Sequence, residues 1–111
     1  MNSTSAEEVA GLLCEHGWTA AKGTAIASRN FETAVGVKTA YAYFYGFREG
    51  SEFATLTGDY ISEGRNVLSS CHVLVPRTAD KSKVAELVAS FAAQAEVAVR
   101  QSYAAHLLKM C

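Results

Sequence analysis

Hydrophobic and polar positions repeat with two different periods along this chain. Within residues 33–75, three segments alternate every second residue, which is the period of a strand with one buried face. A stretch before Gly17 and a longer stretch after Pro76 repeat every three to four residues, the period of an amphipathic helix. The pattern therefore predicts a helix, a run of strands and a second helix.

The N-terminal helix is predicted to span about residues 5–16. Ser5 and Glu8 have the spacing of a capping box, in which each side chain bonds the backbone amide of the other residue. Gly17 accepts the left-handed conformation that commonly ends a helix. The positions expected to face inward are Val9, Leu12 and Leu13.

The C-terminal helix is predicted to begin after Asp80 or Thr78, either of which can cap it, and to continue to about residue 108. Pro76 ends the preceding strand. The apolar stripe expected to pack on the sheet consists of Val84, Leu87, Val88, Phe91, Ala95, Ala98 and Val99. The solvent-facing side is marked by Lys83, Glu86, Gln94 and Gln101.

Turn-forming residues divide the central region into four strands. The first strand is expected within residues 18–28, followed by a turn at 29–32. Hairpin turns are predicted at 49–52 and 62–65, because each contains glycine and polar residues between apolar segments. Strands joined in this way form an antiparallel meander.

The two hairpin turns set a register, and the register sorts the side chains onto two faces. A first turn centred on residues 50–51 places Tyr41 opposite Tyr60, and a second centred on 63–64 places Tyr60 opposite Val67. A slip of one residue would exchange the faces. The face expected to pack on the helices contains Tyr41, Tyr43, Tyr45, Phe47, Ala54, Leu56, Tyr60, Val67, Cys71, Val73 and Val75.

These elements predict one α+β domain over residues 1–111. The expected architecture is a two-layer sandwich, in which an N-terminal helix and a long C-terminal helix pack on one face of a four-stranded antiparallel meander. No element of the chain remains to cover the other face. The tyrosine-rich strand is interpreted as core packing, although a row of rings could also stack on single-stranded nucleic acid.

The uncovered face is predicted to be a protein interface, since its large apolar side chains are too numerous for random scatter. Face-to-face pairing of two copies is the simplest way to bury it, and a homodimer is therefore expected. The predicted interface residues are Phe44, Phe53, Ile61, Leu68, His72 and Leu74.

The polar segment 57–66 has two interpretations. It is either a recognition loop with Asp59, Arg65 and Asn66 as contact residues, or a hairpin in which Asp59, Ser62 and Asn66 bond the local backbone. The sequence favours neither interpretation.

Composition narrows the functional classes. Ten basic and eleven acidic side chains give a net charge of −1, which argues against strong non-specific binding to nucleic acid. The three cysteines form no disulfide pattern and indicate a reducing, cytoplasmic setting. Neither a signal peptide nor a membrane-spanning segment is expected, because residues 1–5 do not resemble a leader and no long apolar run occurs.

Catalytic, metal and cofactor sites are not predicted. His72 could act as a general base oriented by Asp59, but the register separates the two residues by two positions on adjacent strands. The cysteine and histidine pairs match no zinc spacing. We therefore expect a protein that is not an enzyme.

The first functional hypothesis is a small cytoplasmic, non-catalytic binding or adaptor protein. It would self-associate and bind a protein partner through the uncovered face of the sheet. The second hypothesis is a single-strand nucleic-acid-binding protein, which is possible but not favoured by the net charge. Its expected phosphate contacts are Arg29, Lys38, Arg48 and Arg65. Its expected stacking residues are Phe44, Phe53 or Tyr60.

The third hypothesis is a small-ligand-binding protein or enzyme with a pocket between sheet and helix. The residues expected to line that pocket are Trp18, Tyr41, Tyr43 and Tyr60.

Overall fold

The computed structural model describes residues 5–21, 23–33, 36–62 and 64–110. Its elements in chain order are α1 (Ala6–Cys14), β1 (Thr19–Ala20), β2 (Ala27–Thr33), β3 (Gly36–Tyr45), β4 (Phe53–Asp59), β5 (Ile61–Ser62), β6 (Arg65–Asn66), β7 (Val73–Pro76) and α2 (Lys81–Met110). Five strands form one antiparallel sheet in the order β1-β2-β3-β4-β7, while β5 and β6 pair in a separate hairpin.

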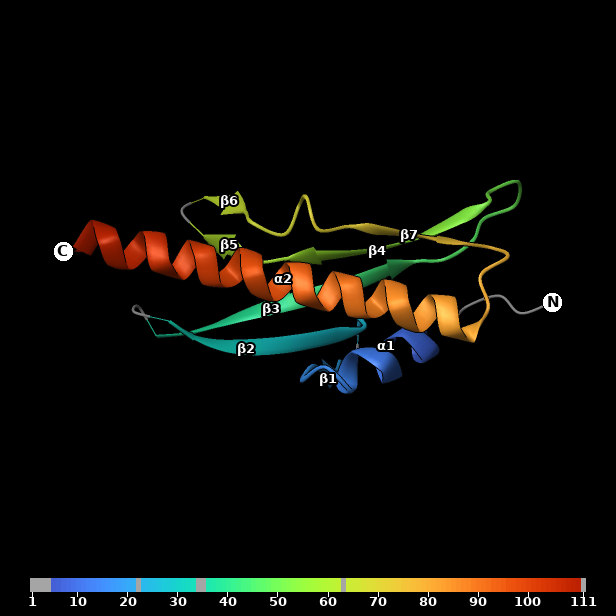
Figure 1. Ribbon diagram of the computed structural model, residues 1–111, viewed down its shortest axis with the longest axis horizontal. Helices are drawn as coiled ribbons and strands as arrows, with labels where there is room; N and C mark the ends of the chain where they lie inside the picture. The colour runs from blue at the N-terminus through green and yellow to red at the C-terminus, as the bar shows by residue number, and fades with distance from the viewer. Residues whose placement is uncertain (1–4, 22, 34–35, 63, 111) are drawn as a thin grey trace.

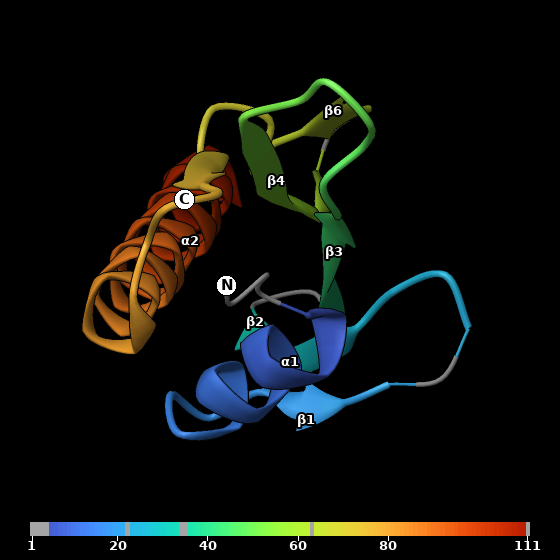
Figure 2. The ribbon, with the colours of Figure 1, turned by 90° about the vertical axis from the view of Figure 1, so that its right-hand side faces the viewer.

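The predicted α+β architecture is confirmed. Figure 1 shows α2 lying along the length of the sheet, and Figure 2 shows α2 on one side of it, with α1 beside β1. The 30 residues of α2 make a helix about 45 Å long, which extends past the strands toward the C-terminus (Figure 1). Among the described residues, no helix is long and apolar enough to cross a membrane.

Both helix starts follow the predicted caps. The Ser5 hydroxyl accepts a hydrogen bond from the Glu8 amide at 3.2 Å. The Asp80 carboxylate accepts one from the Lys83 amide at 2.8 Å, and α2 begins directly after Asp80. Each bond satisfies one of the amides that have no partner in the first helical turn.

The sheet has five strands where four were predicted, because the segment 18–28 divides between two of them. β1 uses only Thr19 and Ala20, and β2 begins at Ala27. The turn predicted at 29–32 is wrong, since these residues lie inside β2 and pair with β3.

Arg29 and Asn30 suggested a turn, but both have partners within the fold. Arg29 projects toward α2 and forms a salt bridge with Glu96 at 3.1 Å. Asn30 accepts a hydrogen bond from the Thr39 hydroxyl of β3 at 2.8 Å. Polar residues can therefore continue a strand here, because contacts from distant parts of the chain satisfy them.

The side of the sheet that packs on α2, the covered face, contains several small residues at its centre. Directly opposed residues point to the same side of a sheet, which assigns to this face Ala27, Arg29, Phe31, Lys38, Ala40, Ala42, Phe44, Ala54, Leu56, Gly58, Val73 and Val75. A Cβ on Gly58 would lie 3.1 Å from the Phe91 ring and 2.9 Å from Leu68. The small residues allow bulky side chains from α2 to reach the sheet.

Trp18 is part of this core. It is 3% exposed, and its ring centroid lies 6.0 Å from that of Phe91. Its Nε1–H has no hydrogen-bond partner among the described residues. A buried donor without a partner reduces stability, so the contribution of Trp18 comes from packing.

The predicted register of β3 and β4 is wrong by one residue. Tyr41 lies opposite Asp59, where Tyr60 had been predicted, and every β3 side chain therefore occupies the other face. Ala40 and Ala42 are fully buried against the helices, whereas the tyrosines of β3 point away from them. The interpretation of the tyrosine row as core packing is thus wrong. The cause is the loop 46–52, which replaces the tight turn assumed at 50–51.

Leu68 lies in the core, which contradicts its predicted place on the uncovered face. The β5–β6 pairing follows the predicted register, but residues 67–72 then leave the sheet before β7 begins. This excursion places Leu56 opposite Val73, and it leaves Leu68 fully buried against Gly58. A detour of this kind has no periodic signature in the sequence.

Candidate functional site

The side of the sheet that faces away from α2, the open face, is the main candidate surface. The register assigns to it Ser28, Asn30, Glu32, Val37, Thr39, Tyr41, Tyr43, Tyr45, Phe53, Thr55, Thr57, Asp59 and Leu74. Figure 2 shows no described helix or strand over this side, although residues 23–26, which precede β2, stand out beside it.

Large apolar and aromatic side chains gather over β3, β4 and β7. Tyr45 is 55% exposed, Leu74 49%, Phe53 45% and Tyr41 43%. Tyr45 lies opposite Thr55, which in turn lies opposite Leu74, so the patch continues across three strands. A contiguous exposed patch of this type is typical of a binding surface.

Acidic groups lie at one end of the open face, and its centre is uncharged. Asp59 and Glu32 are the carboxylates assigned to it, and neither forms a salt bridge within the described part of the chain. Burial raises the pKa of Tyr43 above its ordinary value of 10.0, and the negative charge of Asp59 raises it further. The negative charge of Asp59 therefore disfavours ionisation of a tyrosine in this row.

A hollow of about 180 Å³ adjoins Asp59 at this end of the sheet. It is lined by Lys38, Thr39, Tyr41, Asp59, Tyr60 and Ile61. One cation and one carboxylate thus lie in the same hollow without forming a salt bridge to each other.

The loop 46–52 lies at the opposite end of β3 and β4 and is held by Arg77. The guanidinium donates to the carbonyl of Ser51 at 2.9 and 3.0 Å and to that of Arg48 at 3.0 Å. It also lies 4.7 Å from the centroid of the Phe47 ring. Sequence reasoning missed this contact, because Arg77 follows β7 and is remote from the loop in the chain.

The predicted interface residues separate into two groups. Phe53 and Leu74 lie on the open face, Ile61 is 58% exposed in the adjoining hairpin, and His72 is exposed in the turn before β7. Phe44 and Leu68 face the helices instead, so their predicted placement is wrong. The one-residue slip in β3 moved Phe44, and the excursion at 67–72 moved Leu68.

Within the segment 57–66, Asn66 bonds the local backbone. Its Oδ1 accepts from the amides of Tyr60 and Leu68, each at 3.0 Å, and its Nδ2 donates to the Gly58 carbonyl at 3.1 Å. The side chain thus replaces ladder bonds where the excursion interrupts the sheet. Arg65 is exposed in the same hairpin, whereas Asp59 belongs to the open face.

The pocket predicted between sheet and helix does not bring its four residues together. Trp18 and Tyr60 are buried in the core on the helix side, where Tyr60 contacts Phe31. Tyr41 and Tyr43 lie on the opposite side of the sheet. That part of the third hypothesis is wrong.

The proposed nucleic-acid contacts are also dispersed. Arg29 is paired with Glu96 and lies over the Phe31 ring at 4.7 Å, so it is not free to hold a phosphate. Tyr60 is buried and cannot stack on a base, while Phe44 faces the helices. Phe53 is the member of the stacking set that lies exposed on the open face.

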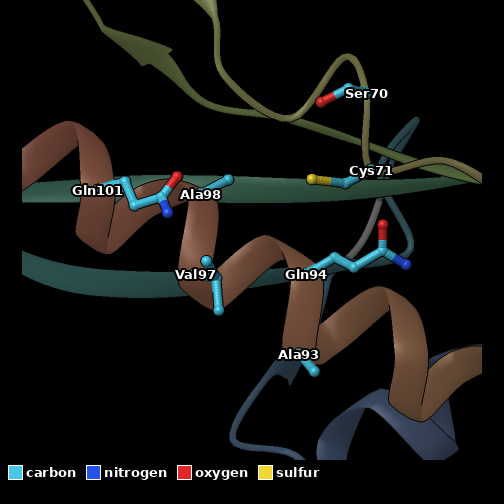
Figure 3. A pocket seen from close by; sticks show the side chains of 7 residues that line it. All are labelled: Ser70, Cys71, Ala93, Gln94, Val97, Ala98 and Gln101. Atoms are coloured by element: carbon cyan, nitrogen blue, oxygen red, sulfur yellow. The ribbon is translucent and has the colours of Figure 1, made fainter.

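A groove of about 380 Å³ lies on the other layer, between α2 and the end of the 67–72 excursion. Figure 3 shows the Cys71 sulfur pointing toward Ala98 of α2. Burial raises the pKa of Cys71, although a hydrogen bond with Ser70 partly opposes this shift. The thiol is therefore neutral at neutral pH and is not an activated nucleophile. The described residues contain no group of three or more His, Cys, Asp or Glu side chains placed to hold a metal ion.

Comparisons with known protein families, with curated proteins and with solved structures found no match for this chain. The function is therefore inferred from the surface of the molecule alone.

Proposed function

We propose that this protein is a small cytoplasmic, non-catalytic binding protein that self-associates through the open face of its sheet. A protein partner of similar surface chemistry would use the same face. The observation that carries the proposal is the exposed patch of Tyr41, Tyr45, Phe53 and Leu74, which the described residues leave uncovered.

The chemistry of the patch suits a second copy of the chain. Its centre has no formal charge, so pairing two copies brings no like charges together there. Tyrosine hydroxyls and the hydroxyls of Thr55 and Thr57 can both donate and accept, which makes the surface self-complementary. Tyrosine is also among the residues enriched in the cores of protein interfaces.

The size of the face predicts a dimer of modest stability. At about 3.3 Å per residue and about 4.8 Å between strands, the face over β2, β3, β4 and β7 measures about 25 Å by 20 Å. Two such faces together bury about 1,000 Å², which is near the lower limit for a specific interface. We therefore expect dimers that dissociate on dilution.

The test compares Tyr45→Asp with Val97→Asp, which is a matched control because the two native side chains are 55% and 54% exposed on opposite layers. Sedimentation velocity over a range of concentrations should detect dimers for the native chain and Val97→Asp. The Tyr45→Asp chain should remain monomeric with unchanged helix content. A native chain that is monomeric at every concentration would rule out self-association.

Single-stranded nucleic acid is a second candidate, favoured by the exposed tyrosine row, because bases stack on aromatic rings. Against it, the charged residues assigned to the open face are Glu32 and Asp59, which repel phosphates. We expect no change in the fluorescence anisotropy of labelled mixed-sequence oligonucleotides at low salt. Binding that weakens with added salt and is lost in Tyr45→Ala would support this candidate.

A further inference from the structure

A carboxylate at one end of the open face is matched by an exposed guanidinium in the loop at the other end. The hollow at one end contains Asp59, which belongs to the open face, whereas Lys38 lines the same hollow from the covered face, opposite Phe31. The loop at the other end exposes Arg48 and Glu49. Among the described residues, neither Arg48 nor Asp59 forms a salt bridge.

The loop has a fixed backbone on which these charges are presented. Arg77 bonds the carbonyls of Arg48 and Ser51, and the Ser51 amide donates to the Arg48 carbonyl at 2.9 Å. These bonds use the backbone of Arg48, so its exposed side chain is available to another molecule. A loop held in this way loses little conformational entropy on binding.

A twofold axis can bring the loop of one copy onto the hollow of another. If the axis lies between two facing sheets and runs perpendicular to the strands, each end of one sheet covers the opposite end of its partner. The position halfway between Tyr41, in the hollow, and Phe47, in the loop, is Phe44. On the open face this point lies between Tyr43 and Tyr45, at the centre of the patch.

We propose that, in the self-associated protein, Arg48 of each copy binds Asp59 of the partner subunit. The inference rests on the proposed function, because it specifies how two open faces are aligned. The contact between the loop and the hollow then fixes the alignment and the orientation of the second copy. The tyrosines supply the contact area, and the charged pairs supply the specificity.

The test uses charge reversal at both ends. Asp59→Lys and Arg48→Glu should each weaken self-association about tenfold or more, because twofold symmetry places two like-charge contacts in every dimer. The effect is read as the dimer dissociation constant from sedimentation at fixed ionic strength. Circular dichroism checks that each variant is folded.

Mixing the two singly substituted chains is the decisive step. In a mixed dimer, the lysine introduced at position 59 would meet the glutamate introduced at position 48 at one end, and the unchanged pair would form at the other end. The mixture should therefore dimerise within about threefold of the native dissociation constant, since every contact again joins opposite charges. If positions 48 and 59 instead interacted within one chain, each substituted chain would keep its own like-charge contact, and mixing would not restore dimerisation.

Lys83→Glu and Glu86→Lys are the matched controls, because these exposed residues of α2 lie on the other layer and undergo the same charge changes. Both should dimerise as the native chain does. Charge reversals at Asp59 and Arg48 that weaken dimerisation without rescue on mixing would overturn the proposed pairing. If neither reversal has an effect while Tyr45→Asp still gives monomers, the pairing is wrong but the proposed function stands.

Discussion

The alanines and the tyrosines of β3 lie on opposite faces of the sheet, and the tyrosines lie on the face that α2 does not cover. The covered face presents Ala40, Ala42 and Gly58, and the bulk of the core there comes from α2. The open face presents the tyrosines of β3. Large aromatic residues in a strand are therefore not evidence of burial by the chain's own helices. These exposed rings are the basis of the proposed self-association.

The strongest test of this contrast places the same substitution on each face. Leu68→Asp buries a carboxylate beside Gly58 in a fully buried position, and we expect a loss of more than about 4 kcal/mol in the free energy of unfolding. Leu74→Asp, at a position 49% exposed, should leave the fold intact and weaken self-association. Chemical denaturation and sedimentation of both variants measure the two effects. Equal destabilisation by the two substitutions would contradict the assignment of faces.

A smaller effect is expected at Asn66, whose side-chain amide bonds both the end of β4 and the segment 67–72. Asn66→Ala removes the acceptor of the Tyr60 and Leu68 amides, and it should cost about 1–3 kcal/mol because these partly buried donors lose their partner. Arg65→Ala, in the same hairpin, is the control and should be nearly neutral, since Arg65 is exposed. Urea titrations of the two variants provide the comparison. If Asn66→Ala were as stable as the native chain, the hydrogen bonds from the Tyr60 and Leu68 amides to Asn66 would not contribute to stability.

The smallest effect concerns pH and involves both faces. Burial raises the pKa of Tyr60 and Cys71 in the core and of Tyr43 on the open face. A raised pKa in the folded chain gives stability that is complete below the ordinary pKa and is lost as the pH rises through the folded value. The midpoint of urea unfolding should therefore decrease above about pH 9, the ordinary pKa of the thiol. Tyr60→Phe should reduce this dependence.

The acidic limb of the same experiment depends on Glu96. Hydrogen bonds from Arg100 and Arg29 lower the pKa of Glu96 below its ordinary value of 4.5. A lowered pKa gives stability that is present above the ordinary value and is lost as the pH falls through the folded value. Because Glu96 is 39% exposed, solvent weakens the interaction and the loss should be small. Glu96→Gln should flatten the curve below pH 4.5, and an unchanged curve would argue against the ion pair.

Local signals in the sequence predicted the helices and the fold class. The caps at Ser5 and Asp80 involve residues three apart, and the stripe on α2 follows a regular period, so both could be recognised without knowledge of the fold. The prediction that one side of the sheet lacks a covering element also agrees with the described part of the structure (Figure 2).

The register of β3 could not be predicted in the same way. Its residues alternate between alanine and aromatic side chains, so either of the two possible registers gives the sheet an apolar face. The correct choice depends on Phe91, a ring from α2 that needs small residues beneath it, and on Arg77, which holds the loop 46–52. Both residues are far from β3 in the sequence, so no local pattern contains the answer.

The position of Trp18 has a spectroscopic consequence. It is the single tryptophan of the chain, and it lies in the core against Phe91, on the far side of the sheet from the exposed tyrosines. Its emission should therefore be shifted toward the blue in the folded protein and should report unfolding without responding to contact at the open face. Tryptophan emission from an unlabelled sample can thus distinguish a variant that fails to fold from one that folds but remains monomeric.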